Sequence, residues 1–153
     1  MSRPSFAHPC PWNRDKGVGV GIDFGDVGPR YPGGYHYGID FFAPEGSPIL
    51  AAAPGLVIAA ERMGAYGLCV HLYHEDDELF SIYGHLSRIL VAVGDEVEAE
   101  QQVGGCGSTG NSSGNHLHFE VRAHSDEREF AVDPMLYIDP RPEYWSGAWL
   151  RRT

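Results

Sequence analysis

Residues 115–122 read Asn-His-Leu-His-Phe-Glu-Val-Arg, and this stretch decides the fold class. Apolar and polar side chains alternate along it, with Leu117, Phe119 and Val121 set against His116, His118 and Glu120. Because successive side chains of a strand point to opposite faces, the alternation predicts a β-strand with one core face and one histidine-bearing face. This histidine-bearing face has two possible explanations. It could be a polar outer face that happens to carry two histidines, or it could be part of a metal site.

The segments around this strand also have the character of short strands joined by turns. The chain of 153 residues contains 20 Gly and 11 Pro, which favours tight turns over long helices. Further strands are expected at 47–53, 56–61, 67–74, 78–83, 88–93 and 96–103. Residues 67–83 predict a hairpin, and Gly94-Asp95 predicts a tight turn between the last two segments. Asp133 to Ile138 predicts one short helical turn capped by Asp133.

We therefore expect one mainly β domain, built on an antiparallel β-sheet with little helix. Residues 1–34 form an irregular lead-in, residues 35–138 form the body, and residues 139–153 form a tail. Trp145 and Trp149 in that tail are expected to pack on the body.

The charge balance limits the class of partner. There are 21 acidic and 11 basic residues, giving a net charge of −10, which disfavours binding to nucleic acid or to an anionic membrane. No segment has the roughly 18 to 20 apolar residues that a membrane-spanning helix needs. The first residues lack the apolar core of a secretory signal peptide. Three widely spaced cysteines do not suggest a disulfide framework, and we expect Cys69 and Cys106 to be buried thiols.

Eight histidines are many for this length, and several of them could form a metal site. His36 and Asp40 are four residues apart, so both point to one face of a strand, although such a pair is more often a surface hydrogen bond. His118 could join them as a third ligand. A catalytic zinc site keeps three protein ligands and leaves one position for water. His85 and His116 would then be suited to proton transfer, because imidazole titrates near neutral pH.

Three segments, in this order, resemble the LytM/lysostaphin-type zinc metallopeptidases of peptidase family M23. They are HYGID at 36–40, YGHLS at 83–87 and GSTGNSSGNHLHFEVR at 107–122. The resemblance covers about residues 33–138, including Asp133-Pro134, which is similar to the closing motif of the family. It implies an antiparallel β-sheet with an open groove that holds one Zn²⁺.

The resemblance also implies a role for each site residue. His36, Asp40 and His118 would bind Zn²⁺, and His85 and His116 would be the catalytic pair that polarises water and stabilises the oxyanion. Tyr31 lies near the position of a tyrosine of the groove wall that helps to hold the oxyanion in some members. Glu120 and His74 are candidates for supporting the ligand histidines through hydrogen bonds.

The implied activity is cleavage of peptidoglycan, at stem peptides or cross-bridges, by a zinc-dependent endopeptidase that acts on the cell wall. With no signal peptide in view, a phage-type lysin or virion protein is one route of delivery. The alternative is a catalytically silent module that binds wall peptide or activates another hydrolase, which the five intact site positions disfavour. A lipoyl- or biotinyl-type carrier domain is rejected, because the single lysine, Lys16, lies in the irregular lead-in. The sequence leaves the oligomeric state open.

Overall fold

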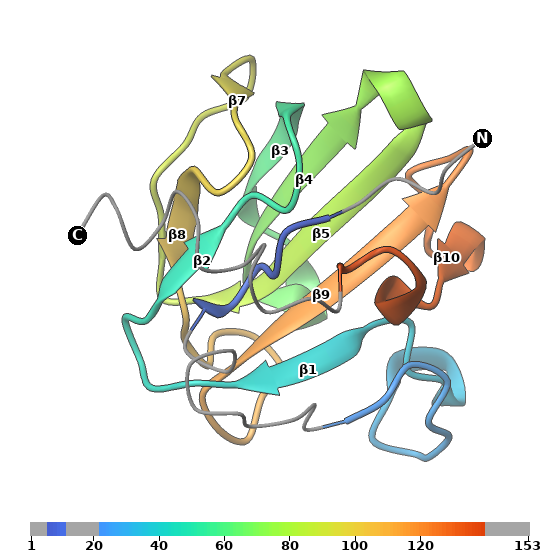
Figure 1. The fold of residues 1–153 in the computed structure, drawn as a ribbon. Helices are drawn as coiled ribbons and strands as arrows, with labels where there is room; N and C mark the ends of the chain where they lie inside the picture. Colours follow the sequence, from blue (N-terminus) through green and yellow to red (C-terminus); the bar gives the residue numbers. More distant parts are fainter. Residues whose placement is uncertain (1–5, 12–21, 140–153) are drawn as a thin grey trace.

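The computed structural model describes residues 6–11 and 22–139, and these form two antiparallel sheets (Figure 1). The larger sheet has seven strands in the order β1-β9-β5-β4-β3-β7, and β10 also pairs with β9. Its strands are β1 (Ile39–Phe42), β3 (Gly55–Arg62), β4 (Leu68–His74), β5 (Leu79–Leu86), β7 (Glu96–Val97), β9 (His116–Ala123) and β10 (Ala131–Val132). The prediction of a mainly β, antiparallel fold is confirmed.

Strand β9 lies inside this sheet, between β1 and β5 (Figure 1). Its alternating apolar residues form a core face as predicted, since Leu117, Phe119 and Val121 are all completely buried. The other face is buried as well: His118 is 8% exposed and Glu120 is 0% exposed. The alternative of a solvated polar face is therefore wrong. These polar side chains line a buried site instead.

The predicted hairpin is formed by β4 and β5. Its register pairs His74 with Leu79 and Val70 with Tyr83. The charged segment between the strands is a 3₁₀ turn, η3 (Glu75–Asp77), followed by Glu78 in the left-handed region at φ 52°. The hairpin carries β5 back to β9, where Gly84 pairs with His118.

The smaller sheet has the order β2-β8-β6, with β2 at Pro48–Leu50, β6 at Arg88–Ile89 and β8 at Gln102–Gly105. The turn at Gly94-Asp95 is present, and the backbone amide of Asp95 donates to the carbonyl of Ala92. The segments on either side of this turn pair with each other only at their outer ends, where β6 and β8 are antiparallel neighbours in the small sheet, whereas β7, directly after the turn, joins β3 in the large one. The chain between β6 and β8 therefore leaves the small sheet and contributes β7 to the large one.

The helical elements with defined bounds are all 3₁₀ turns of three residues. They are η1 (Pro32–Gly34), η2 (Gly64–Tyr66), η3, η4 (Arg128–Phe130) and η5 (Pro134–Leu136). The predicted capped turn is η5: the Asp133 side chain accepts a hydrogen bond from the backbone amide of Met135. Asp133 thus satisfies an amide at the start of the turn that has no partner within it.

The core includes residues from the expected lead-in. Phe6 and Cys10 are fully buried, and Phe6 forms a parallel bridge with Ile138 near the other end of the described chain. Cys69 and Cys106 are buried thiols, as expected, and Cys10 is buried as well. Trp145, Trp149 and Lys16 lie outside the described residues.

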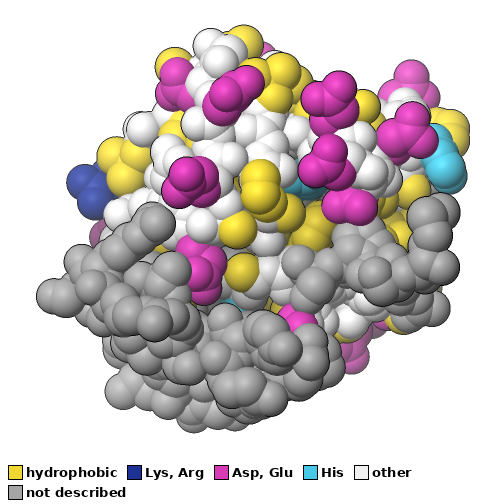
Figure 2. Space-filling view, turned by 45° about the horizontal axis from the view of Figure 1, so that its top comes forward, with side chains coloured by type: hydrophobic (Ala, Val, Ile, Leu, Met, Phe, Trp, Pro, Cys, Tyr) yellow, Lys and Arg dark blue, Asp and Glu magenta, His cyan; other side chains and the backbone are white. Residues whose placement is uncertain are grey.

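The surface reflects the acidic composition. Figure 2 shows Asp and Glu side chains spread over the described part of one face, with little Lys or Arg among them. In the described ranges, no helix is long and apolar enough to cross a membrane.

Candidate metal centre and groove

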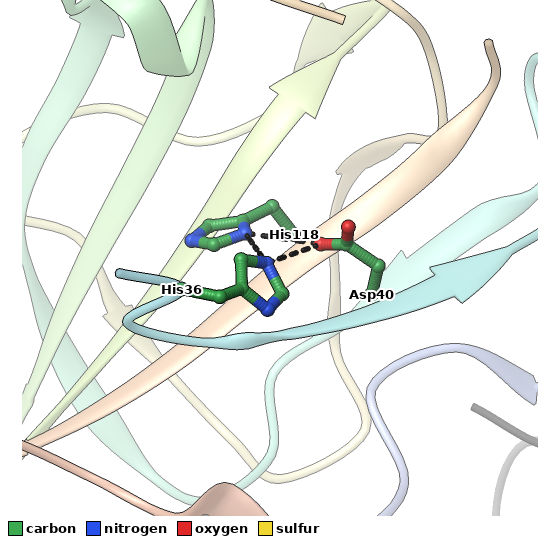
Figure 3. Close-up of side chains that lie close together, drawn as sticks. All are labelled: His36, Asp40 and His118. Atoms are coloured by element: carbon green, nitrogen blue, oxygen red, sulfur yellow. Dashed lines mark hydrogen bonds and ion pairs between the residues drawn. The ribbon is translucent and has the colours of Figure 1, made fainter. Parts of the chain in front are cut away.

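The side chains of His36, Asp40 and His118 converge on one point (Figure 3). His36 Nε2 lies 3.2 Å from Asp40 Oδ1 and 3.3 Å from His118 Nδ1, and His118 Nδ1 lies 3.0 Å from Asp40 Oδ1. All three residues are buried. The structure thus brings together the three residues that the sequence predicted as ligands.

The sheet register places two of these residues. Asp40 on β1 is directly opposite His118 on β9, so their side chains project from neighbouring positions on one face. The third residue, His36, precedes β1 rather than lying in it, so the expected strand over 36–40 is wrong at residues 36–38. The backbone of His36 pairs with Gly25 and Asp26 instead, and its Nδ1 donates to the Asp23 carbonyl at 2.8 Å.

The donor set fits a tetrahedral zinc ion. Ligand atoms about 2.0–2.1 Å from zinc in a tetrahedron lie about 3.3–3.4 Å from one another. The three separations here, 3.0–3.3 Å, match those edges closely. Because His36 Nδ1 donates to a carbonyl, its Nε2 presents a lone pair to the same point as the His118 and Asp40 atoms. The lone pairs of the two histidines and the Asp40 carboxylate face one another, and a cation between them would stabilise this arrangement.

The electrostatics of the described side chains favour positive charge at this point. Burial opposes ionisation of Asp40, but its hydrogen bonds with His118 and His36 outweigh burial and hold the pKa of Asp40 below its usual range. Burial likewise opposes charge on His118, while Asp40 and Glu120 raise the pKa of His118 to about 9. The two carboxylates therefore generate a field that holds a proton or another cation at His118.

His85 and His116 lie beside the three converging residues, with their ring centroids 4.6 Å apart. Each donates Nδ1–H to a backbone carbonyl, His85 to Thr109 at 2.7 Å and His116 to Gly114 at 2.8 Å. Those bonds fix the tautomer and leave each Nε2 with a lone pair, and His116 Nε2 lies 3.7 Å from Asp40 Oδ2. Burial lowers the pKa of His85 to about 4, so this ring is neutral at pH 7. His85 follows the end of the β5–β9 pairing at φ 60°, a conformation that costs a non-glycine residue free energy and clusters at functional sites.

An ionic network contacts His118 and runs from the buried Glu120 and Arg122 to the partly exposed Asp126. Glu120 Oε2 lies 3.5 Å from His118 Nε2 and 3.2 Å from Nη2 of Arg122. Arg122 continues through Nη1 to Asp126 at 3.1 Å, and Asp126 lies 2.8 Å from Nδ1 of His71. The expected contact of Glu120 with a site histidine is present. Sequence reasoning missed Arg122 and Asp126, because nothing in their local pattern marks them as partners of the site.

Tyr31 and His74, the other two residues expected to support the site, differ from each other in position. Tyr31 lines the groove, where its ring stacks on His36 at 4.9 Å and its hydroxyl donates to Asp26 at 2.6 Å. His74 bonds to the Pro54 carbonyl and to the Ser81 hydroxyl, each at 2.7 Å, and packs on Phe6. Support of the metal ligands by direct contact with His74 is therefore not seen in the described part of the chain.

A groove of about 510 Å³ runs over these residues. Four tyrosines line it, namely Tyr31, Tyr35, Tyr37 and Tyr66, together with Arg30, Arg128 and the 111–113 loop. Tyr66 was not singled out in the sequence, because it lies in η2 outside any motif. Its ring is 5.5 Å from that of His118, and burial raises the pKa of its hydroxyl, which keeps it protonated.

The chain is similar to known peptidases. The sequence profile of peptidase family M23 matches residues 34–134. The glycyl-glycine endopeptidase ALE-1 of Staphylococcus capitis is 37% identical over 139 residues, which cover 86% of this chain and 36% of ALE-1. The DD-carboxypeptidase/endopeptidase Mpg of Neisseria gonorrhoeae is 38% identical over 108 residues, 71% of this chain and 24% of Mpg. The chain thus spans about a quarter to a third of the length of these curated relatives.

Solved structures of peptidase catalytic domains are also similar to this chain. The catalytic domain of lysostaphin from Staphylococcus simulans has a TM-score of 0.77 and 35% identity, covering 84% of this chain and 96% of that domain. A point mutant of the catalytic domain of the prophage-encoded M23 protein EnpA from Enterococcus faecalis has a TM-score of 0.62 and 39% identity, covering 76% of this chain and 88% of that one. With its profile match, its sheet and its converging His-Asp-His residues, the chain belongs to peptidase family M23, in the LytM/lysostaphin type.

Proposed function

We propose that this protein is a zinc-dependent endopeptidase that cleaves peptide bonds of peptidoglycan, in the domain formed by residues 35–138. The observation that carries the proposal is the convergence of His36 Nε2, Asp40 Oδ1 and His118 Nδ1 within 3.3 Å of one another. The names of the relatives support the reaction class: one is an endopeptidase of glycyl-glycine bonds and another a DD-carboxypeptidase/endopeptidase.

In this proposal His36, Asp40 and His118 hold Zn²⁺. When bound, the ion would supply Lewis-acid chemistry, lowering the pKa of a water molecule and polarising the scissile carbonyl. The Nε2 atoms of His85 and His116 accept a proton from the attacking water and return one to the leaving amine, because both Nδ1 atoms are tied to carbonyls. The imidazolium formed in this way would also stabilise the negative oxygen of the tetrahedral intermediate.

Three further residues would orient the ligand histidines. Glu120 holds the His118 ring through Nε2, leaving Nδ1 as the ligand atom, and Arg122 keeps the Glu120 carboxylate charged. Tyr31 fixes the plane of His36 by stacking on it, and its hydroxyl would have to leave Asp26 to reach an oxyanion in the groove.

Metal analysis of purified wild type and of His118→Ala, together with release of soluble fragments from purified cell walls, tests the proposal. We expect about one zinc per wild-type chain and fragment release, and neither in the variant. His124→Asn is the matched control, because His124 is exposed and its positive φ suits asparagine. Cell-wall binding without zinc or cleavage in wild type would favour a silent binding module instead.

We also propose delivery as a phage-type lysin, which the prophage-encoded EnpA relative supports. Such a protein, added from outside, should lyse intact cells of its host as well as isolated walls. Activity confined to isolated walls would argue against this route.

A further inference from the structure

Two basic residues of this acidic chain lie in the groove. The protein has 11 basic residues against 21 acidic ones, yet Arg30 and Arg128 both line the groove beside the converging His36, Asp40 and His118. Arg30 is already matched, because its Nη2 lies 2.7 Å from Asp26 Oδ2 and its side chain is 63% exposed. The positive charge of Arg128 is not matched in this way by a carboxylate of the described residues.

Arg128 is half-buried at the start of η4 and is held against an aromatic ring. Its guanidinium carbon lies 4.8 Å from the centroid of Tyr37, the residue that follows His36. No carboxylate of the described residues lies within 4.0 Å of its guanidinium nitrogens. Stacking on an aromatic face uses the flat side of a guanidinium and leaves the N–H groups at its edge free to donate.

The approach to this guanidinium is kept open by Gly33 of η1. A Cβ at residue 33 would lie 3.8 Å from Nη2 of Arg128 and 3.9 Å from the Tyr37 hydroxyl, so a longer side chain would extend over the donors. Gly33 also has φ +81°, which disfavours any other residue. The guanidinium of Arg128 is therefore a preformed, half-buried pair of hydrogen-bond donors. It lies against Tyr37, the residue after the candidate ligand His36.

We propose that Arg128 binds a free carboxylate of the substrate peptide and so selects carboxylate-bearing stem peptides over uncharged glycine bridges. The inference rests on the endopeptidase function proposed above. A planar guanidinium pairs with a carboxylate through two parallel hydrogen bonds, and such charge-assisted pairs are stronger in a partly desolvated groove. Because the net charge of −10 repels an acidic peptide, a local cation of this kind favours its binding.

The test compares three peptides with the zinc-loaded protein: a stem pentapeptide ending in D-Ala-D-Ala with free carboxyls, the same peptide with its carboxyls amidated, and end-blocked pentaglycine. We expect wild type to have its highest kcat/KM on the first peptide. Arg128→Gln should lower kcat/KM on that peptide by about ten- to hundredfold and leave the amidated peptide within about twofold. Arg128→Lys should fall between them, because it keeps the charge and loses the fork. Arg88→Gln, an exposed arginine on β6, is the matched control and should match wild type.

Equilibrium binding of the same peptides by titration calorimetry separates this inference from the proposed function. A tenfold or larger loss of affinity in Arg128→Gln, confined to the free-carboxyl peptide, supports carboxylate recognition even if no peptide is cleaved. Equal losses on all three peptides, or a wild-type preference for pentaglycine, overturn the inference and leave the endopeptidase function standing. Wild type that is loaded with zinc and still cleaves none of the peptides overturns the function alone.

Discussion

Gly38 lies so close to His118 that it has no room for a side chain. A Cβ at residue 38 would be 2.9 Å from Cε1 of His118 and 2.5 Å from the carbonyl oxygen of Phe119. Glycine between His36 and Asp40 is therefore what lets the segment that leads into β1 approach β9, and this approach brings the three converging residues together.

We expect Gly38→Ala to displace His118 or the β9 backbone and to weaken zinc binding by about tenfold or more. It should also destabilise the fold by about 1–3 kcal/mol, as overpacking of a filled site does. Competition with a chromogenic chelator and thermal unfolding measure the two effects. Gly114→Ala is the control, because nothing lies within 4 Å of a Cβ there. Unchanged zinc affinity in Gly38→Ala would show that the close approach does not shape the site.

Glu120→Gln should weaken zinc binding by about 10- to 100-fold, because the carboxylate that orients His118 is lost and Arg122 is left buried with less compensation. Chelator competition gives the affinity, and circular dichroism checks that the variant is folded. Glu96→Gln, at an exposed position of β7, should behave as wild type. A folded Glu120→Gln with wild-type affinity would contradict the positioning role.

His85→Asn should lower kcat by about 10²–10⁴-fold with one zinc retained, since His85 is proposed to move a proton and not to bind the metal. Asparagine is chosen because residue 85 has φ 60°, which asparagine tolerates. Elemental analysis alongside steady-state kinetics distinguishes the two roles. Loss of zinc together with activity would make His85 a ligand or a ligand support.

His74 should make the fold less stable in mild acid. Burial lowers the pKa of His74 below 6.5, against a smaller opposing effect of its bond to the Pro54 carbonyl. Below pH 6.5 the unfolded chain then takes up a proton that the folded chain resists, so the contribution of His74 is full above that pH and is lost as the pH falls. The drop in Tm between about pH 7.5 and pH 5.5 should be smaller in His74→Gln than in wild type. The exposed His124→Asn serves as control, and equal drops in wild type and His74→Gln would refute this origin.

Local pattern was sufficient for the elements that form from near neighbours in the chain. The alternation in β9, the charged turn of the β4–β5 hairpin and the Asp133 cap all depend on residues a few positions apart, and all three are present. Pairing over longer distances was harder to predict. The turn at Gly94-Asp95 was predicted, but the pairing of β7 with β3 of the large sheet, between the paired strands β6 and β8 of the small one, was not.

The sequence by itself determined that this is a β protein with His36, Asp40, His85, His116 and His118 as candidate site residues, because side-chain period and residue chemistry are local properties. Tertiary structure alone decided that both faces of β9 are buried and that His36 meets His118 across 82 positions of the chain. It also decided that Arg122 backs the site and that Arg128 borders the groove. Those relations depend on sheet register and on loops packed over the sheet, and such contacts between distant segments leave no periodic trace in the sequence.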